Sequence, residues 1–397
     1  MNSDSQLVIR GVTLFEEGAT IDNAIVIINS DLILYAGPEI QLPVSTSRFT
    51  IIDGDGWIVS PGLIDLQING AYGFDFTSQT DSIPSVASRL PETGVTSFLP
   101  TLITSPIEDY SGKLRAVLDA QQELVGARVL GAHVEGPFLN KIKKGAHNPI
   151  LFYEPTTALL EKIFPLEVVR IVTLAPELFH SLEAIRWLVA RGIIVSMGHS
   201  AANEVETLAA IGAGVTYGTH LFNAMPAMHH RTPGLVGVFL TSNLARFGLI
   251  VDGLHIHPRM VQMAWKCRGH KGITLITDAM EGMGMPHGEY KVGNRKVTVS
   301  EKGAWLKDGT SLAGSILSMD EAVRNMIQFS GCTPAQAIRM ASTTPAEVLR
   351  INDKFGHLKS GYIADITIFD RSLLVQATIV QGTLVFSTPS AQERFMK

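Results

Sequence analysis

Two stretches of this chain, IIVSMGHS (193–200) and VTYGTHLFN (215–223), contain the same order of features. Each is a short apolar run that ends at a histidine, His199 in the first stretch and His220 in the second. Their separation is that of a β-strand, a helix and a loop. Histidines at the exits of successive parallel strands point into one opening, where they can share a metal ion. One such histidine alone would more often be a hydrogen-bonded structural residue, but two at equivalent places favour metal ligands.

The same pattern continues on both sides of this pair. Helical patterns occupy most of the intervals between successive apolar runs. The eight runs are 62–69, 96–101, 129–136, 169–176, 193–200, 215–223, 247–255 and 273–280. Eight buried strands alternating with helices predict an α/β fold, a (β/α)₈ barrel of the TIM type. The interval 222–247 is rich in Met, His, Pro and Gly and is a candidate functional loop, and 319–329 and 334–349 are predicted as closing helices.

The two ends of the chain have a different texture. Residues 7–60 and 364–387 consist of β-branched runs separated by Gly, Asp and Asn turns, and 289–306 has the pattern of hairpin strands. We therefore expect a small β-sandwich domain built from both termini. The predicted bounds are 1–60 plus 361–397 for the sandwich, with a possible hairpin insertion at 289–310, and 61–360 for the barrel.

Composition narrows the class of protein. The chain has 397 residues, 46% hydrophobic and 17% charged, which is enough for a large core, and its net charge of −5 argues against nucleic-acid binding. The two cysteines, Cys267 and Cys332, are isolated, so a reducing compartment fits. No signal peptide and no apolar run of roughly 18 residues is present, so we expect a cytoplasmic protein without a membrane partner.

Polar residues gather at the carboxyl ends of the predicted strands, where enzymes of this fold build their active sites. They are Gln67, Asn69, Glu135, His199, His220, Asp252, His255 and Asp278. In isolation, Glu135 would be a solvated residue of a Glu-Gly-Pro turn. Beside His199 and His220 it completes three ligands that, with a fourth position left to water, form a catalytic zinc arrangement. Iron or another divalent ion would suit the same ligands.

Further side chains could carry chemistry. Asp278 is the candidate general base, although an aspartate after a strand also serves as a helix N-cap. His147, in a loop after the third strand, could polarise a carbonyl or be an ordinary surface residue. His255 is a candidate for binding substrate hydroxyls, whereas His257 reads as a helix-start residue. Arg231, in the run His229–His230–Arg231, could bind phosphate or simply be solvated.

Many of these motifs together resemble a known family. PGLIDLQING, PTLITS, HVEGPFLN, KKGAHN, TLAPE, GHS, THLFNAM, DGLH, TDA and LAGS occur in this order over nearly the whole chain. The chain thereby resembles the N-acetylglucosamine-6-phosphate deacetylases of the amidohydrolase superfamily. The resemblance implies hydrolysis of N-acetyl-D-glucosamine 6-phosphate to D-glucosamine 6-phosphate and acetate, in amino-sugar catabolism. It also implies one divalent metal ion per subunit, Zn²⁺ before Fe²⁺, Co²⁺ or Mn²⁺.

The resemblance assigns roles to individual residues. It makes Glu135, His199 and His220 the metal ligands, Asp278 the base and then the acid, and His147 the group that polarises the acetyl carbonyl. The implied sugar-phosphate contacts are Ala146, Asn223, Ala224, Arg231, His255, Leu312, Ala313 and Gly314. In such enzymes the phosphate-binding arginine comes from the neighbouring subunit, so a homodimer with Arg231 reaching the neighbouring site is implied.

The sequence departs from the wider superfamily in one respect. The usual His-x-His of the first strand is here Gln67-Ile68-Asn69, and the TLAPE strand has no lysine. Ligands for a second ion are therefore missing, so we expect one metal ion, with Gln67 and Asn69 supporting the water or the metal. Two alternatives stay open: a deacetylase of a related N-acetylated sugar or sugar phosphate, such as the galactosamine epimer, and a metal-free scaffold that keeps only the amidohydrolase fold.

Overall fold

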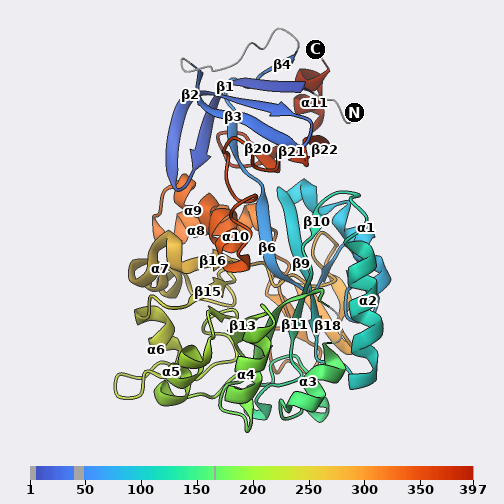
Figure 1. Ribbon diagram of the computed structural model, residues 1–397, viewed down its shortest axis with the longest axis vertical. Coiled ribbons are helices and arrows are strands. Elements are labelled where there is room, and N and C mark those ends of the chain that lie inside the picture. The colour runs from blue at the N-terminus through green and yellow to red at the C-terminus, as the bar shows by residue number, and fades with distance from the viewer. Residues whose placement is uncertain (1–5, 40–48, 165–166, 397) are drawn as a thin grey trace.

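A computed structural model describes residues 6–39, 49–164 and 167–396 of the chain. The molecule is elongated, with a sheet that holds both termini at one end and a larger body of strands and surrounding helices at the other (Figure 1). Among the described residues, no helix combines the length and apolar character that crossing a membrane requires.

The larger body is a barrel of parallel strands. In order around the barrel they are β6 (Leu63–Ile68), β9 (Val95–Ile103), β11 (Ala132–Glu135), β12 (Val169–Leu174), β13 (Ile194–Met197), β14 (Tyr217–Gly218), β15 (Arg246–Leu249) and β16 (Ile273–Leu275). A parallel bridge between Ile68 and Ala279 brings the segment after β16 back to β6 and closes the ring. These strands correspond to the eight apolar runs, so the predicted barrel is confirmed.

Burial explains why the strands are continuous apolar runs. Helices cover the outer face of a parallel barrel and side chains fill its inside, so both faces of each strand lose water. All nine residues of β9 are buried, and so are all residues of β6, β11 and β13. Several polar side chains inside the barrel bond to one another, as Thr173 does to Thr219 at 2.7 Å.

Helices surround the barrel, and two expectations about them need correction. The helices are α1 (Ile83–Ala87), α2 (Tyr110–Ala120), α3 (Thr157–Ile163), α4 (Ser181–Ala190), α5 (Glu204–Ala213), α6 (Gly234–Thr241), α7 (Pro258–Gly272), α8 (Met319–Ser330), α9 (Pro334–Ala341) and α10 (Thr343–Leu349). The interval 222–247 is not one irregular loop, because α6 and the start of β15 lie within it. The helix predicted over 334–349 is broken at Ser342, whose backbone is not helical (φ −134°, ψ −77°).

Strands from both termini share a second sheet. Its order is β22 (Thr383–Ser387), β21 (Val375–Val380), β20 (Ile366–Phe369), β5 (Ile58–Pro61), β1 (Gln6–Glu16), β2 (Ala19–Asn29) and β3 (Leu32–Pro38), and β4 (Thr50–Asp53) also pairs with β1. The antiparallel pairing of β5 with β20 joins the two ends of the chain. A final helix, α11 (Pro389–Phe395), places Phe395 against Trp57. The fold class is as predicted, and the domain bounds at 60/61 and 360/361 remain a prediction.

A small antiparallel sheet lies against the barrel opening. It consists of β17 (Gly288–Val292), β18 (Arg295–Ser300) and β19 (Gly303–Leu306), within the predicted hairpin region. Its apolar side chains form a cluster with Ile103, at the end of β9, and with Met280, just beyond β16. The sheet therefore lies at the carboxyl ends of the barrel strands.

Candidate active site

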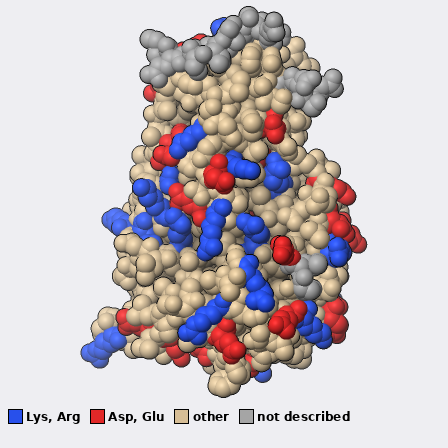
Figure 2. Space-filling model, in the orientation of Figure 1, with Lys and Arg blue, Asp and Glu red and all other residues tan. Residues whose placement is uncertain are grey.

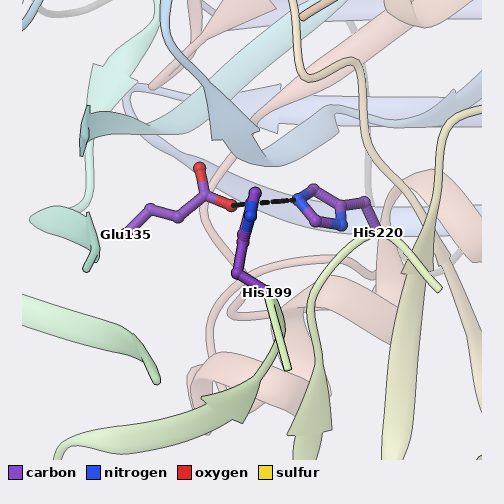
Figure 3. A group of neighbouring side chains, drawn as sticks. All are labelled: Glu135, His199 and His220. Atoms are coloured by element: carbon purple, nitrogen blue, oxygen red, sulfur yellow. Dashed lines mark hydrogen bonds and ion pairs between the residues drawn. The ribbon is translucent and has the colours of Figure 1, made fainter. Parts of the chain in front are cut away.

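The carboxyl ends of three barrel strands bring Glu135, His199 and His220 together. Glu135 ends β11, and the two histidines follow β13 and β14. Its Oε1 atom lies 3.2 Å from Nε2 of His199 and 3.0 Å from Nε2 of His220, and the two Nε2 atoms are 3.1 Å apart (Figure 3). All three side chains are buried and point toward one another.

These separations fit a bound metal ion. Ligand atoms about 2.0–2.1 Å from a tetrahedral ion lie roughly 3.3 Å from one another, close to what the three atoms show. The hydrogen bonds that His199 and His220 make with Glu135 hold the pKa of that carboxyl well below its usual range, although burial alone would raise it. One carboxylate and two imidazoles are a ligand set that divalent ions accept.

A backbone contact orients the ring of His199. Its Nδ1 lies 2.9 Å from the carbonyl oxygen of Lys143. A carbonyl oxygen only accepts, so Nδ1 donates to it, and Nε2 is the ring nitrogen directed at Glu135 and His220. Nδ1 of His220, in contrast, is buried and has no hydrogen-bond partner among the described residues.

Asp278 faces the cluster, held by two amide side chains. Its Oδ1 accepts hydrogen bonds from Nδ2 of Asn69, at 2.7 Å, and from Nε2 of Gln67, at 3.1 Å. The same Gln67 amide also donates to Glu135, 3.2 Å away, so it bridges the two carboxyl groups. Burial, and after it the charge of Glu135, raise the pKa of Asp278 to about 6. A carboxyl group in this state accepts and returns protons near neutral pH.

His147 lies on another side of the cluster. Its ring is 4.5 Å from that of His199 between centroids, and its Nδ1 shares a hydrogen bond of 2.9 Å with the hydroxyl of Thr104. Burial lowers the pKa of His147 to about 3, so the ring is neutral. When the Thr104 hydroxyl donates to Nδ1, Nε2 carries the proton and is available to donate to a ligand oxygen.

The backbone at the strand exits is unusual. His199, His220 and Asp278 all have positive φ angles, 48°, 28° and 48°. Side chains other than glycine rarely adopt this left-handed region, and residues held there cluster at functional sites. All three residues follow a barrel strand and line the opening of the barrel.

A cavity of about 380 Å³ opens in front of the cluster. The residues singled out from the sequence that line it are Asn69, Glu135, Ala146, His147, His199, His220, Asn223, Ala224, His255, Asp278, Leu312 and Gly314. Gln67 and Ala313 are buried beside it rather than at its surface. Arg231 is exposed and is not part of this lining. His257 caps the start of α7, its Nδ1 accepting from the Arg259 backbone N–H.

Sequence reasoning missed part of the lining. Trp305 and Val292 come from the small sheet, and Thr310 and Ser311 follow it. Residues 289–306 carry a clear hairpin pattern, but nothing in that pattern places the hairpin over the barrel opening. The sequence also did not show that Asp252 contacts His255. Its Oδ2 atom lies 2.6 Å from Nδ1 of His255.

The chain is similar to several known proteins. Residues 58–385 match the model of the Amidohydrolase family. The chain is 41% identical over 354 residues to N-acetylglucosamine-6-phosphate deacetylase of Homo sapiens, covering 86% of each protein. It is 38% identical over 347 residues to N-acetylgalactosamine-6-phosphate deacetylase of Escherichia coli O157:H7, covering 86% of this chain and 90% of that protein. Among solved structures, the chain is similar to a variant of N-acetyl-D-glucosamine-6-phosphate deacetylase from Mycobacterium smegmatis in complex with N-acetyl-D-glucosamine-6-phosphate. The TM-score is 0.89 and the sequences are 28% identical. The similarity covers 96% of this chain and 100% of that one.

Proposed function

This chain belongs to the amidohydrolase family, and we propose that it hydrolyses N-acetyl-D-glucosamine 6-phosphate to D-glucosamine 6-phosphate and acetate. The observation that carries the proposal is the buried set of Glu135, His199 and His220 facing Asp278 across one cavity. The names of the relatives at about 40% identity support the substrate.

Glu135, His199 and His220 would hold one divalent ion, for which we propose Zn²⁺ before Fe²⁺, Co²⁺ or Mn²⁺. Bound there, the ion would polarise the acetyl carbonyl and lower the pKa of water. Gln67 and Asn69 stand where the wider superfamily has the histidines of a second ion. Both donate to Asp278, so we assign them to holding that carboxylate in place.

The protein side chains move the protons of the reaction. Asp278 accepts a proton from the water that attacks the acetyl carbon, while His147 donates a hydrogen bond to the carbonyl oxygen. The bond between that carbon and the nitrogen then breaks, and Asp278 gives its proton to the departing amine. Acetate and a free amino sugar result.

We assign substrate contacts to the remainder of the lining. Asn223, Ala224, His255 and Ala146 border the cavity together with Leu312 and Gly314, and Ala313 lies between the last two. They would position the sugar and its phosphate.

We further propose a homodimer in which Arg231 reaches the neighbouring site. Two features support it: Arg231 is exposed outside its own cavity, and loops at the same barrel end expose large apolar side chains. Among these, Ile142 is 83% exposed, Ile150 85% and Phe179 74%. Contiguous apolar patches mark contact surfaces. These three side chains come from loops that follow the neighbouring strands β11 and β12.

Subunit mixing tests the dimer. Asp278→Asn and Arg231→Ala proteins, each inactive alone, are mixed and allowed to exchange subunits. A mixed dimer has one site with an intact Asp278 and the intact Arg231 of the other subunit, so activity should return to about half that of the wild type in each mixed dimer. If Arg231 serves its own subunit, the mixture stays inactive, which would contradict the shared site.

A substrate comparison tests the proposed reaction. Acetate release by the metal-loaded protein is measured with N-acetylglucosamine 6-phosphate, N-acetylgalactosamine 6-phosphate and free N-acetylglucosamine. We expect the highest kcat/KM for the first. A higher kcat/KM for the galactosamine epimer would favour a second candidate function, deacetylation of N-acetylgalactosamine 6-phosphate. The similarity to the Escherichia coli enzyme supports that candidate. If none of the three compounds releases acetate, both deacetylase functions are refuted and a metal-free scaffold is favoured.

A further inference from the structure

A second cavity of about 380 Å³ lies at the other end of the barrel. Its lining includes Thr216, directly before β14, Arg246, the first residue of β15, and Gly272, directly before β16. These positions are at the amino ends of the strands, whereas the candidate active site lies at their carboxyl ends. We call this second site the basal cavity.

The basal cavity is strongly cationic. Arg246, Arg268, Lys271 and Arg350 line it, with Glu347 as the single carboxylate. Lys and Arg side chains gather in a band at the level of α7, β16 and α10 on the face shown in Figure 2. The lining therefore has three more positive than negative side chains, an excess that suits an anion.

The one carboxylate is fully engaged. Oε2 of Glu347 lies 2.7 Å from Nη2 of Arg246, and Oε1 lies 2.8 Å from Nη2 of Arg339, outside the cavity lining. Within the part of the chain that the structure describes, Arg268, Lys271 and Arg350 take part in no ion pair. No carboxylate of the described ranges neutralises these three cations.

Arg268 is held in place although no carboxylate pairs with it. Its Nη1 and Nη2 atoms donate to the backbone carbonyls of Phe239 and Ala245, each at 2.8 Å. Burial, and after it the nearby charge of Arg246, lower the pKa of Arg268. An anion in the basal cavity would relieve this repulsion.

We propose that the basal cavity binds a small molecule that carries a phosphate group. Arginine recognises phosphate through several N–H donors in a fixed plane, and lysine adds a point charge. The remaining lining fits a larger body attached to the phosphate, since Leu244 and Val348 offer apolar contacts and Thr216 and Asn243 offer polar ones. The site is independent of the acetyl-hydrolysing machinery, which shares no lining residue with it.

Equilibrium dialysis of the metal-loaded protein with radiolabelled inorganic phosphate tests the proposal. The double variant Lys271→Gln, Arg350→Gln alters two exposed side chains of the cavity, so it should fold normally. Arg186→Gln, which removes an exposed arginine of α4, is the matched control. We expect the double variant to bind one phosphate fewer per chain than wild type, or to bind it at least tenfold more weakly, while the control is unchanged.

Further arms separate the possible outcomes. Displacement of the labelled phosphate by adenosine 5′-monophosphate or by ribose 5-phosphate supports the proposal and identifies a nucleotide or a sugar phosphate as the larger body. Displacement by neither, or equal displacement by chloride at the same concentration, overturns it. Equal phosphate binding by wild type and the double variant also overturns the proposal. Equal rates of acetate release and equal melting temperatures show that the two proteins are folded alike.

Discussion

At the scale of single residues, hydrogen bonds decide which atom of each side chain is available. The Lys143 carbonyl directs Nε2 of His199 into the site, and the two amides of Gln67 and Asn69 occupy Oδ1 of Asp278. His255 is held in the same manner by Asp252. That hydrogen bond holds the pKa of the Asp252 carboxyl below its usual value although burial alone would raise it.

Asp252→Asn should impair substrate binding more than catalysis. The asparagine oxygen can still accept from the backbone N–H groups of Leu254 and His255, so the loop keeps its shape. Its NH₂ group, however, donates where Oδ2 accepted a hydrogen bond from Nδ1 of His255, so the tautomer of that ring is reversed. Steady-state kinetics should show KM raised about tenfold with a smaller change in kcat, the size expected for one charge-assisted hydrogen bond. A lower metal content in the variant, or an unchanged KM, would contradict this role.

The functional side chains at the ends of the barrel strands could be predicted from the sequence, because each follows an apolar run that ends at a His, Glu or Asp. Partners from distant segments were not. Thr104 lies 43 positions from His147, and the carbonyl that orients His199 belongs to a residue 56 positions away. Trp305 lines the cavity from a hairpin. The sequence pattern of that hairpin predicts β-strands but not where they pack.

At the scale of elements, helix α5 follows the strand that carries His199. Asn203 caps its first turn: its side chain accepts from the backbone N–H of Glu206, and the Glu206 carboxylate accepts from the backbone N–H of Asn203. Such a capping box satisfies two N–H groups that a helix start otherwise leaves without a partner. The cap thus fixes where the chain turns after the strand exit.

Asn203→Ala should lower the free energy of unfolding by about 1 kcal/mol, the typical cost of a lost cap. Thr156→Ala is the matched control, because Thr156 is the exposed N-cap residue of α3 but its side chain accepts no hydrogen bond from that helix. Urea unfolding of both variants provides the comparison. Equal decreases in the free energy of unfolding for the two variants would show that the Asn203 cap does not stabilise α5.

The periodic elements were predicted and the interruptions were not. Apolar runs and helical spacing are properties of neighbouring residues, so all eight barrel strands were visible in the sequence. The break at Ser342 and the start of α6 at Gly234, with φ of 60°, depend on how the chain meets the rest of the molecule. Tertiary packing rather than local propensity fixes such points.

At the scale of the whole molecule, a buried carboxyl group joins the barrel to the sheet of the two termini. Asp365, just before β20, accepts from the backbone N–H of Gln381 at 2.7 Å and lies 3.8 Å from Nη2 of Arg128, on β10 (Arg128–Val129) of the barrel sheet. Its other oxygen, Oδ2, is buried without a partner among the described residues. Burial raises the pKa of Asp365 to about 6, although the charge of Arg128 opposes this shift.

This junction should make stability depend on pH. Between pH 3.8, the ordinary pKa, and about 6 the folded protein binds a proton at Asp365 that the unfolded chain has lost, so this group makes stability fall as pH rises. The full difference is about 3 kcal/mol, and it is present above pH 6. In Asp365→Asn, the fall in unfolding free energy between pH 4 and 7 should shrink by an amount of this order. Asp353→Asn, at an exposed carboxyl group, is the control, and parallel pH curves for wild type and Asp365→Asn would contradict the account.

In the proposed reaction, Asp278 moves the protons of amide hydrolysis while Glu135, His199 and His220 hold the metal ion. Metal content and acetate release from N-acetylglucosamine 6-phosphate, measured on one sample of Asp278→Asn, test it directly. We predict one divalent ion per chain, as in wild type, and acetate release reduced about 10³-fold, the range of general acid–base catalysis. Acetate release near the wild-type rate from the metal-loaded variant would show that Asp278 does not move these protons.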